Sequence, residues 1–247
     1  MFFFSIFGFL RLFREITHWH VWRPNRGILG RFFRLGWPKG LEFLLTNAIF
    51  SVFALLAGWI GVRAVAANTI TLQTALLVSY TLPLAVADVV TVRVGAALAR
   101  ESHREKWRAL NGGMMALAIV LLPPVVLFGV FPEWVVALFV DPEMPESQAL
   151  LSLASPLILL LAVFVIVDGL RLVGGQALNG LSDMRAPTLI AALAYWGIAL
   201  PLGAWLGFAM DLGVLGFWIG LTLGIAVAAG CYLARFRRLA RAIKIAV

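Results

Sequence analysis

The sequence is poor in cysteine and in charged residues. Its single cysteine, Cys231, has no second cysteine to pair with, which excludes an intrachain disulfide framework and a zinc site built on cysteines. Only 13% of the residues are charged, whereas 62% are hydrophobic, and the mean hydropathy is +0.96. Few soluble domains have this composition. We therefore predict a protein that lies mainly within a lipid bilayer.

Charge-poor runs recur along the chain, and each is close to the roughly 20 residues that a membrane-spanning helix requires. Because backbone groups in lipid must bond within their own segment, each run is expected to form a helix. The runs are Phe43–Ile60, Ala64–Ala87, Ala109–Phe131, Gln148–Val167, Ala186–Met210 and Leu212–Ala234. We predict an all-α, polytopic membrane protein with about six transmembrane helices in residues 35–247.

The first 34 residues differ from the rest of the chain. Residues 2–10 are apolar, but this segment is too short to cross a hydrocarbon core about 30 Å thick. Arg11 and Arg14 follow the apolar segment, whereas a secretory signal peptide has its basic residues before the apolar core. We predict an interfacial or truncated helix, followed by a basic linker that ends at residue 34.

Basic residues are distributed unevenly among the connections. They gather before the first predicted span, between the second and third, between the fourth and fifth, and at the C-terminal end. In the alternate connections Arg63 is the only basic residue. Residues 131–148 include acidic residues but no Lys or Arg. By the positive-inside rule, both termini are expected in the cytoplasm, with the spans in the inner (plasma) membrane. Topology and anionic lipids also explain the net charge of +8, so nucleic acid is not an expected partner.

Residue patterns typical of enzymes are missing from the sequence. His18, His20 and His103 lie outside the predicted spans, and no nucleophile is paired with a base. No spacing of residues is typical of a metal site. We predict that the protein is not an enzyme and has no cofactor.

Polar side chains inside the apolar spans are the candidate functional residues, since ionisable groups within a membrane are costly and commonly functional. Asp168 lies in an apolar run that continues to Arg171, and a spacing of three places both on one helix face. The remaining candidates are Glu42, Thr46, Asn47, Asn68 and Gln73. Two structural interpretations stay open: a static Asp168–Arg171 ion pair, and hydrogen bonding between helices by the polar cluster around Asn68.

Proline residues interrupt several of the predicted spans. Each removes a helical hydrogen bond and tends to kink the helix. The prolines concerned are Pro83, Pro123, Pro124, Pro156 and Pro201. They are either tolerated, as prolines often are in membrane helices, or open a cavity and let helices bend during transport.

Several segments resemble one transporter family, in order along the chain. Residues 168–187 read DGLRLVGGQALNGLSDMRAP, which closely resembles the tenth helix and the following loop of multidrug and toxic compound extrusion (MATE) transporters. Residues 35–41 (LGWPKGL), 91–95 (TVRVG) and 195–203 (YWGIALPLG) are similar to parts of that family's seventh, eighth and eleventh helices. The resemblance runs from about residue 35 to residue 238 and covers only the second of the family's two six-helix lobes.

The resemblance implies a secondary antiporter that exports small organic, often cationic, compounds against H⁺ or Na⁺. Asp168 falls on the family's tenth-helix acid, which is implicated in cation coupling and is a candidate Na⁺ ligand. Thr46 occupies the position of the seventh-helix acid of many members, and Glu42, one turn earlier, is the candidate substitute. Asn68 and Thr69 stand where many members have His-Gln. Burial favours a neutral acid, whereas Arg171 favours a carboxylate, so both coupling ions stay open.

Asn47, Asn68, Gln73 and Arg171 are expected with Thr46 to line the substrate cavity. Residues 2–10 would be a remnant of the family's sixth helix. Because one lobe supplies only one wall of the family's cavity, a truncated or assembly half-transporter that is inactive alone is one alternative. It would need a first-lobe half or a second copy of itself as partner. A lipid-linked precursor flippase of the same superfamily is the other alternative.

Overall fold

The fold is described from a computed structural model, which describes residues 26–139 and 145–242. The predicted apolar segment 2–10 and the linker up to residue 25 lie outside the described residues. The chain divides into two units, residues 1–37 and 38–247. The predicted boundary at residue 34 stays a prediction.

Helices make up almost all of the described chain, and residues 26–139 and 145–242 contain no strand. Six helical stretches are long and apolar enough to cross a membrane. This confirms the predicted all-α class and the predicted number of spans. The helices are α2 (Arg26–Ile60), α3 (Val62–Ala99), α4 (His103–Val130), α5 (Pro132–Ala137), α6 (Pro145–Gly180), α7 (Arg185–Ala192), η2 (Leu193–Ala199), α8 (Leu200–Ala204), η3 (Trp205–Ala209) and α9 (Gly213–Ala242).

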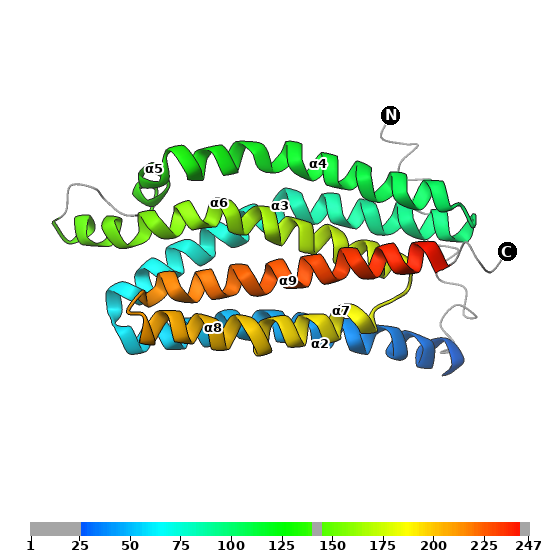
Figure 1. Ribbon diagram of the computed structural model, residues 1–247, viewed down its shortest axis with the longest axis horizontal. Helices are drawn as coiled ribbons and strands as arrows, with labels where there is room; N and C mark the ends of the chain where they lie inside the picture. Colours follow the sequence, from blue (N-terminus) through cyan, green and yellow to red (C-terminus); the bar gives the residue numbers. More distant parts are fainter. Residues whose placement is uncertain (1–25, 140–144, 243–247) are drawn as a thin grey trace, which may run out of the picture. The chain divides into compact units, whose positions relative to one another are not determined.

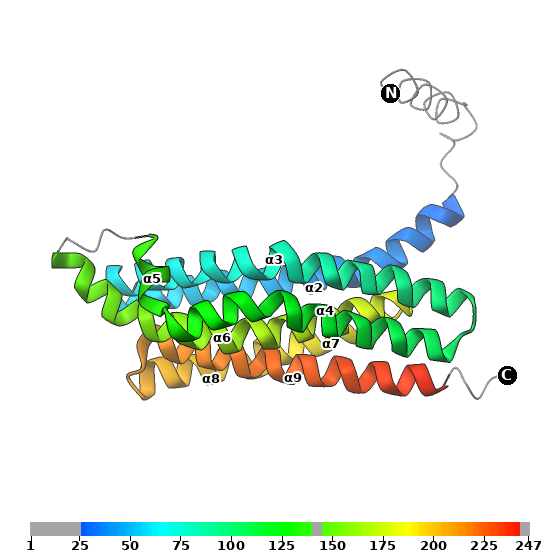
Figure 2. The ribbon, with the colours of Figure 1, turned by 90° about the horizontal axis from the view of Figure 1, so that it is seen from above.

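The sixth span, in α9, is the most enclosed of the spans. In the most apolar 18-residue stretch of each span, 61% of the residues are buried in the sixth span, against 22–39% in the other spans. It packs on one side against α6 and on the other against the fifth span, which runs from α7 to η3 (Figure 1). Helices α3 and α4 pack against α6 and against each other, as the second view also shows (Figure 2). The core therefore lies along α6 and α9.

The fifth span departs from regular α-helical geometry. Pro83, Pro123 and Pro156 lie within unbroken α-helices. Around Pro201, in contrast, the π-helical segments η2 and η3 flank the short helix α8. A proline lacks the backbone donor of a helical hydrogen bond, and wider π turns are one way for a helix to absorb the mismatch. The positions of the prolines in the sequence did not show that, among the described spans, the one around Pro201 would adopt π-helical geometry.

Glycines bring the backbones of the fifth and sixth spans very close together. We call Gly203, Gly207, Gly216, Gly220 and Gly224 the glycine seam. A Cβ atom added to Gly220 would lie 2.4 Å from the Cα and N atoms of Gly203. A Cβ atom on Gly216 would lie 2.5 Å from the backbone nitrogen of Gly207. Small residues spaced by four commonly permit such contact between membrane helices.

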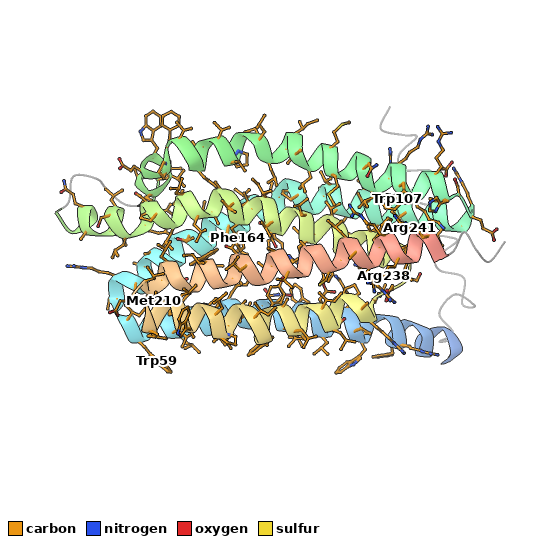
Figure 3. All side chains as sticks on the ribbon, viewed as in Figure 1. Trp59, Trp107, Phe164, Met210, Arg238 and Arg241 are labelled. Carbon is orange, nitrogen blue, oxygen red and sulfur yellow. The ribbon has the colours of Figure 1, made fainter. Side chains whose placement is uncertain are left out.

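The two ends of the helical unit differ in charge (Figure 3). Arg238 and Arg241 lie at one end, where Trp107 of α4 packs edge-on against Phe236 of α9 with ring centroids 5.7 Å apart. Trp59 and Met210 lie at the opposite end. We call these the basic end and the opposite end. Assignment of the basic end to the cytoplasm stays a prediction.

Candidate functional site

A buried ion pair occupies the centre of the candidate site on α6. Arg171 donates from Nε to Oδ1 of Asp168 at 2.8 Å, and a terminal guanidinium nitrogen of Arg171 lies 2.8 Å from the same oxygen. The side chains of Arg171 and Asp168 are only 11% and 8% exposed. The spacing of three along the helix places them on one face, as predicted, and their contact is the ion pair that the sequence left open as a structural interpretation. Both contacts use Oδ1, and no ion pair or hydrogen bond occupies Oδ2 among the described residues.

A small polar cavity adjoins this pair. It has a volume of about 10 Å³, and its polar lining consists of Thr46, Ser79, Tyr80, Asp168, Arg171 and Tyr195. Such a volume is close to the lower limit for one water molecule. The hydroxyl oxygens of Ser79 and Tyr195 are buried without a hydrogen-bond partner in the described part of the chain. Buried polar atoms seldom lack partners, so an ion or a water molecule is the expected occupant.

Glu42 reaches the same region from α2 and is only 4% exposed. Its Oε2 atom accepts a hydrogen bond from Lys39 Nζ at 3.0 Å, and its Oε1 atom accepts one from the Tyr232 hydroxyl at 3.4 Å. The single proton of the Tyr232 hydroxyl is shared with the Pro187 carbonyl, whose oxygen lies 3.0 Å away. Glu42 is therefore held by charge on its own helix and by α9.

A second cavity, of about 170 Å³, lies beside the first. Lys39, Glu42 and Gln176 line it, and Thr46, Tyr80 and Arg171 line both cavities. The structure thus brings together Glu42, Thr46, Asp168 and Arg171, four of the residues selected from the sequence. Their roles in coupling and lining stay predictions.

All three tyrosines of the chain lie at this site, a feature that the sequence reasoning missed. Tyr80 and Tyr195 line the small cavity, and Tyr232 contacts Glu42. Tyr195 belongs to the π-helical segment η2. The chain has 18 phenylalanines but only three tyrosines, so the rare hydroxyl-bearing rings were a usable signal. Ser79 carried no comparable signal.

The other selected polar residues lie outside these two cavities. Asn68 is buried and accepts a hydrogen bond from Trp218 Nε1 at 3.0 Å, which ties α3 to α9. Asn47 donates to the carbonyl of Phe43 within its own helix. Gln73 is exposed on the surface of α3. Asn68 thus links helices, while the expected contribution of all three to a substrate path stays a prediction.

Helix α3 is also joined to α6 nearer the basic end. Asp88 accepts a hydrogen bond from Gln176 Nε2 at 2.6 Å, and the hydroxyl of Thr91 donates to the Gln176 carbonyl at 2.9 Å. A Cβ atom on Gly180 would lie 2.7 Å from the Thr91 carbonyl oxygen, so the two backbones approach closely here. Asp88 therefore pairs with a neighbouring helix.

The chemistry of the site is that of oxygen donors around one carboxylate. The described residues contain no group of three or more His, Cys, Asp or Glu side chains that could hold a metal ion. Asp168 with the hydroxyls of Ser79, Thr46 and Tyr195 offers hard oxygen ligands, which suit a proton or a small hard cation better than a transition metal. Arg171 already holds the carboxylate, so any cation must compete with it.

The fold and the site define a class: a polytopic helical membrane protein with an ion-sized polar site between its helices. Residues 38–205 match the MatE family, and the chain belongs to that family. It is 35% identical over 227 residues to the probable multidrug resistance protein NorM of Synechococcus sp., covering 92% of this chain and 49% of that protein. The multidrug resistance protein NorM of Burkholderia vietnamiensis is 36% identical over 211 residues, covering 84% and 45%.

Solved structures share the fold at low sequence identity. The crystal structure of MATE in the straight conformation has a TM-score of 0.82 and 21% identity, and the match covers 97% of this chain and 54% of that one. An outward-facing multidrug resistance MATE family transporter of the MOP superfamily has a TM-score of 0.78 and 21% identity, covering 92% and 49%. The chain spans about half the length of the relatives it matches. These findings confirm the resemblance to one half of a MATE transporter.

Proposed function

We propose that this chain is the second lobe of a MATE-type antiporter, which exports small organic, often cationic, compounds against H⁺ or Na⁺. The observation that carries the proposal is the buried Asp168 beside a cavity with unsatisfied hydroxyls. Family membership and the NorM relatives support multidrug export as the function of the whole transporter. The proposal places both termini in the cytoplasm and requires a partner lobe to complete the substrate path.

Competition for Asp168 provides a coupling step. In the structure Arg171 neutralises the carboxylate through Oδ1. A proton on Asp168, or Na⁺ held by Asp168 with the hydroxyls of Ser79 and Tyr195, weakens that pair and frees Arg171. Because Arg171 also lines the larger cavity, its release changes the charge there. When the ion binds, the freed positive charge would repel a cationic compound from that cavity. Ion binding would therefore oppose binding of the compound, which is the direction of coupling that antiport needs.

The test is ion-dependent drug efflux from cells without endogenous pumps. The chain is expressed alone, and together with the first-lobe half of a NorM relative, after membrane insertion of each is verified. Asp168→Asn is the test variant and Asp88→Asn the matched control, since an asparagine at position 88 can still accept the hydrogen bond from Gln176. We expect efflux with the partner lobe, its loss in Asp168→Asn and its retention in Asp88→Asn. Coupled efflux by the Asp168→Asn variant would refute the coupling role.

The same experiment separates the alternative functions. Efflux by the chain alone would indicate a homodimer, whereas efflux only with the first lobe identifies a half-transporter. A lipid-linked precursor flippase would need unpaired basic side chains facing its cavity. In the described residues Arg171 is paired with Asp168 and Lys39 with Glu42. The site therefore favours the antiporter.

A further inference from the structure

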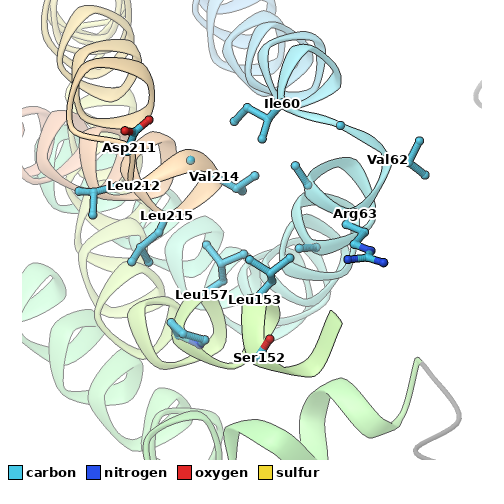
Figure 4. A pocket seen from close by; sticks show the side chains of 15 residues that line it. Ile60, Val62, Arg63, Ser152, Leu153, Leu157, Asp211, Leu212, Val214 and Leu215 are labelled. Carbon is cyan, nitrogen blue, oxygen red and sulfur yellow. The ribbon is translucent and has the colours of Figure 1, made fainter. Parts of the chain in front are cut away.

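A larger cavity lies at the opposite end of the helical unit, away from Asp168. Its volume is about 580 Å³, within the range of roughly 300–1,000 Å³ that is usual for ligand pockets. We call it the end pocket (Figure 4). Its lining is mainly aliphatic and includes Ile60, Val62, Leu153, Leu157, Leu212 and Leu215. No residue of the proposed coupling site lines it.

Two tight turns form the rim of the end pocket. Gly61 alone connects α2 to α3 and has φ of +142°, and Gly213 at the start of α9 has φ of +55°. Asp211, between η3 and α9, also has a left-handed backbone, with φ of +54°. Left-handed conformations are unfavourable for most residues, although Gly and Asp tolerate them. The rim is therefore specified by residue types that suit these turns.

Opposite charges lie on the two sides of the pocket. Figure 4 shows Arg63 on one side and Asp211 on the other, with aliphatic side chains between them. Both residues are exposed, and no ion pair joins them in the described structure. Arg63 is also the single basic residue among the connections that share this end of the molecule. A basic residue there is an exception to the near absence of Lys and Arg from these connections. It has no role in the proposed antiport.

The two charges of the pocket lie at the ends of spans, whereas its aliphatic lining extends further along the helices. Asp211 lies outside the spans, and Arg63 is the second residue of the span Val62–Ala99. Leu157 lies nine residues into the span Gln148–Gly180, which corresponds to about 13 Å along the helix. Both charges therefore lie at the ends of the spans, and the aliphatic lining begins at that level, with Val62 and Leu212, and continues along the helices to Leu157. This is the arrangement that an amphiphile with a polar head and a hydrocarbon chain requires.

We propose that the end pocket binds a phospholipid with an ethanolamine headgroup. Its phosphate binds Arg63, its ammonium group binds Asp211, and one acyl chain enters the aliphatic pocket. An arginine–phosphate contact is charge-assisted, and a primary ammonium can donate hydrogen bonds to a carboxylate. A choline headgroup has no N–H donor, and a glycerol headgroup has no positive charge for Asp211. The proposal does not depend on the antiport function.

Lipid retention by the purified full chain tests this assignment. The chain is equilibrated in nanodiscs with equal parts of phosphatidylethanolamine, phosphatidylcholine and phosphatidylglycerol, and the lipids that remain bound after transfer to detergent are measured by native mass spectrometry. We expect phosphatidylethanolamine to be enriched about fivefold over each of the others, as one charge-assisted contact allows. Equal retention of the three lipids, or a preference for another of them, would overturn the proposal.

Variants locate the binding site on the molecule. Arg63→Ala should reduce retention of phosphatidylethanolamine, and Asp211→Asn should remove its advantage over the other two lipids. Ala67→Phe fills the pocket near Leu157 and should reduce retention of all three. Arg104→Ala and Glu133→Gln change exposed charges outside the pocket and serve as controls. Because Arg63 and Asp211 are exposed, their variants should fold, and an unchanged preference in both would refute the end pocket as the site.

Discussion

The glycine seam and the coupling site use the same two spans in opposite ways. In the seam, Gly203 and Gly220 leave no room for even one added carbon atom. A few turns away, Tyr195 from the fifth span and Tyr232 from α9 contribute to a site with two cavities, and the Tyr195 hydroxyl has no hydrogen-bond partner in the described residues. In the first region backbones are in direct contact, whereas the second contains side chains with unused hydrogen-bonding groups.

This difference indicates which part of the lobe moves. Backbones in direct contact cannot slide or rotate without steric overlap, so the seam should hold the fifth and sixth spans together as one body. Side chains with unused hydrogen-bonding groups can exchange partners at small cost. We therefore expect ion binding to change contacts around Asp168 and Arg171 while the seam stays intact.

Gly220→Leu should be the most damaging change. Its Cβ atom would overlap the backbone of Gly203, which cannot move aside as a flexible side chain would. We expect a loss of at least about 3 kcal/mol in the free energy of unfolding, or no folded protein. Gly230→Leu is the control on the same helix, because a Cβ atom there meets nothing within 4 Å. Thermal unfolding in detergent compares the two. Equal stability of the variants would show that the seam is not rigid.

Removing one partner of the Asp168–Arg171 pair should be the next largest effect. Asp168→Ala leaves a buried guanidinium without its counter-charge, which commonly costs about 3 kcal/mol or more. In the double variant Asp168→Ala/Arg171→Met neither charge of this pair remains, so most of the stability should return while coupled efflux stays lost. Unfolding temperatures of the single and double variants measure this. A double variant as unstable as Asp168→Ala would show that the pair is not an independent unit.

Asn68 and Trp218 should behave as structural residues, unlike Asp168. Asn68→Leu leaves the buried Trp218 Nε1 donor without an acceptor, which costs roughly 2 kcal/mol. Asn68→Leu/Trp218→Phe removes both hydrogen-bonding groups, so the double variant should recover part of that loss. Efflux per folded molecule should stay close to wild type in both variants. A loss of ion dependence at full stability would instead assign Asn68 to the coupling site.

The sequence was sufficient to predict the membrane spans and to select Asp168 as the candidate acid. It did not predict which residues surround Asp168. Long apolar runs determine membrane helices, so six spans were predictable, and a spacing of three was sufficient to place Arg171 beside Asp168. Glu42 and Thr46 were selected together, as polar residues one turn apart in the first span, and both line the cavity beside the pair. Local patterns could not reveal that Tyr232, distant in sequence, reaches Glu42, because that contact depends on how α9 packs against α2.

The seam and the π-helical turns were not predicted either, for a different reason. Glycines in a membrane helix are common, and their significance depends on which backbone lies opposite each one. Gly216 and Gly230 look alike in the sequence, yet only Gly216 faces another backbone at contact distance. Likewise Pro201 resembles Pro156, but only the helix around Pro201 adopts π geometry. Tertiary packing decides both features.

The variants with the smallest expected change in stability concern the two unpaired hydroxyls of the coupling site. Ser79→Ala and Tyr195→Phe each remove a buried hydroxyl that makes no hydrogen bond in the described structure. Losing an unpaired polar group removes no protein interaction, so stability should stay within about 0.5 kcal/mol of wild type. If these hydroxyls bind the coupling ion, half-maximal efflux should need a higher Na⁺ concentration in both variants. An unchanged Na⁺ dependence, with the H⁺ dependence intact, would leave Asp168 to carry a proton alone.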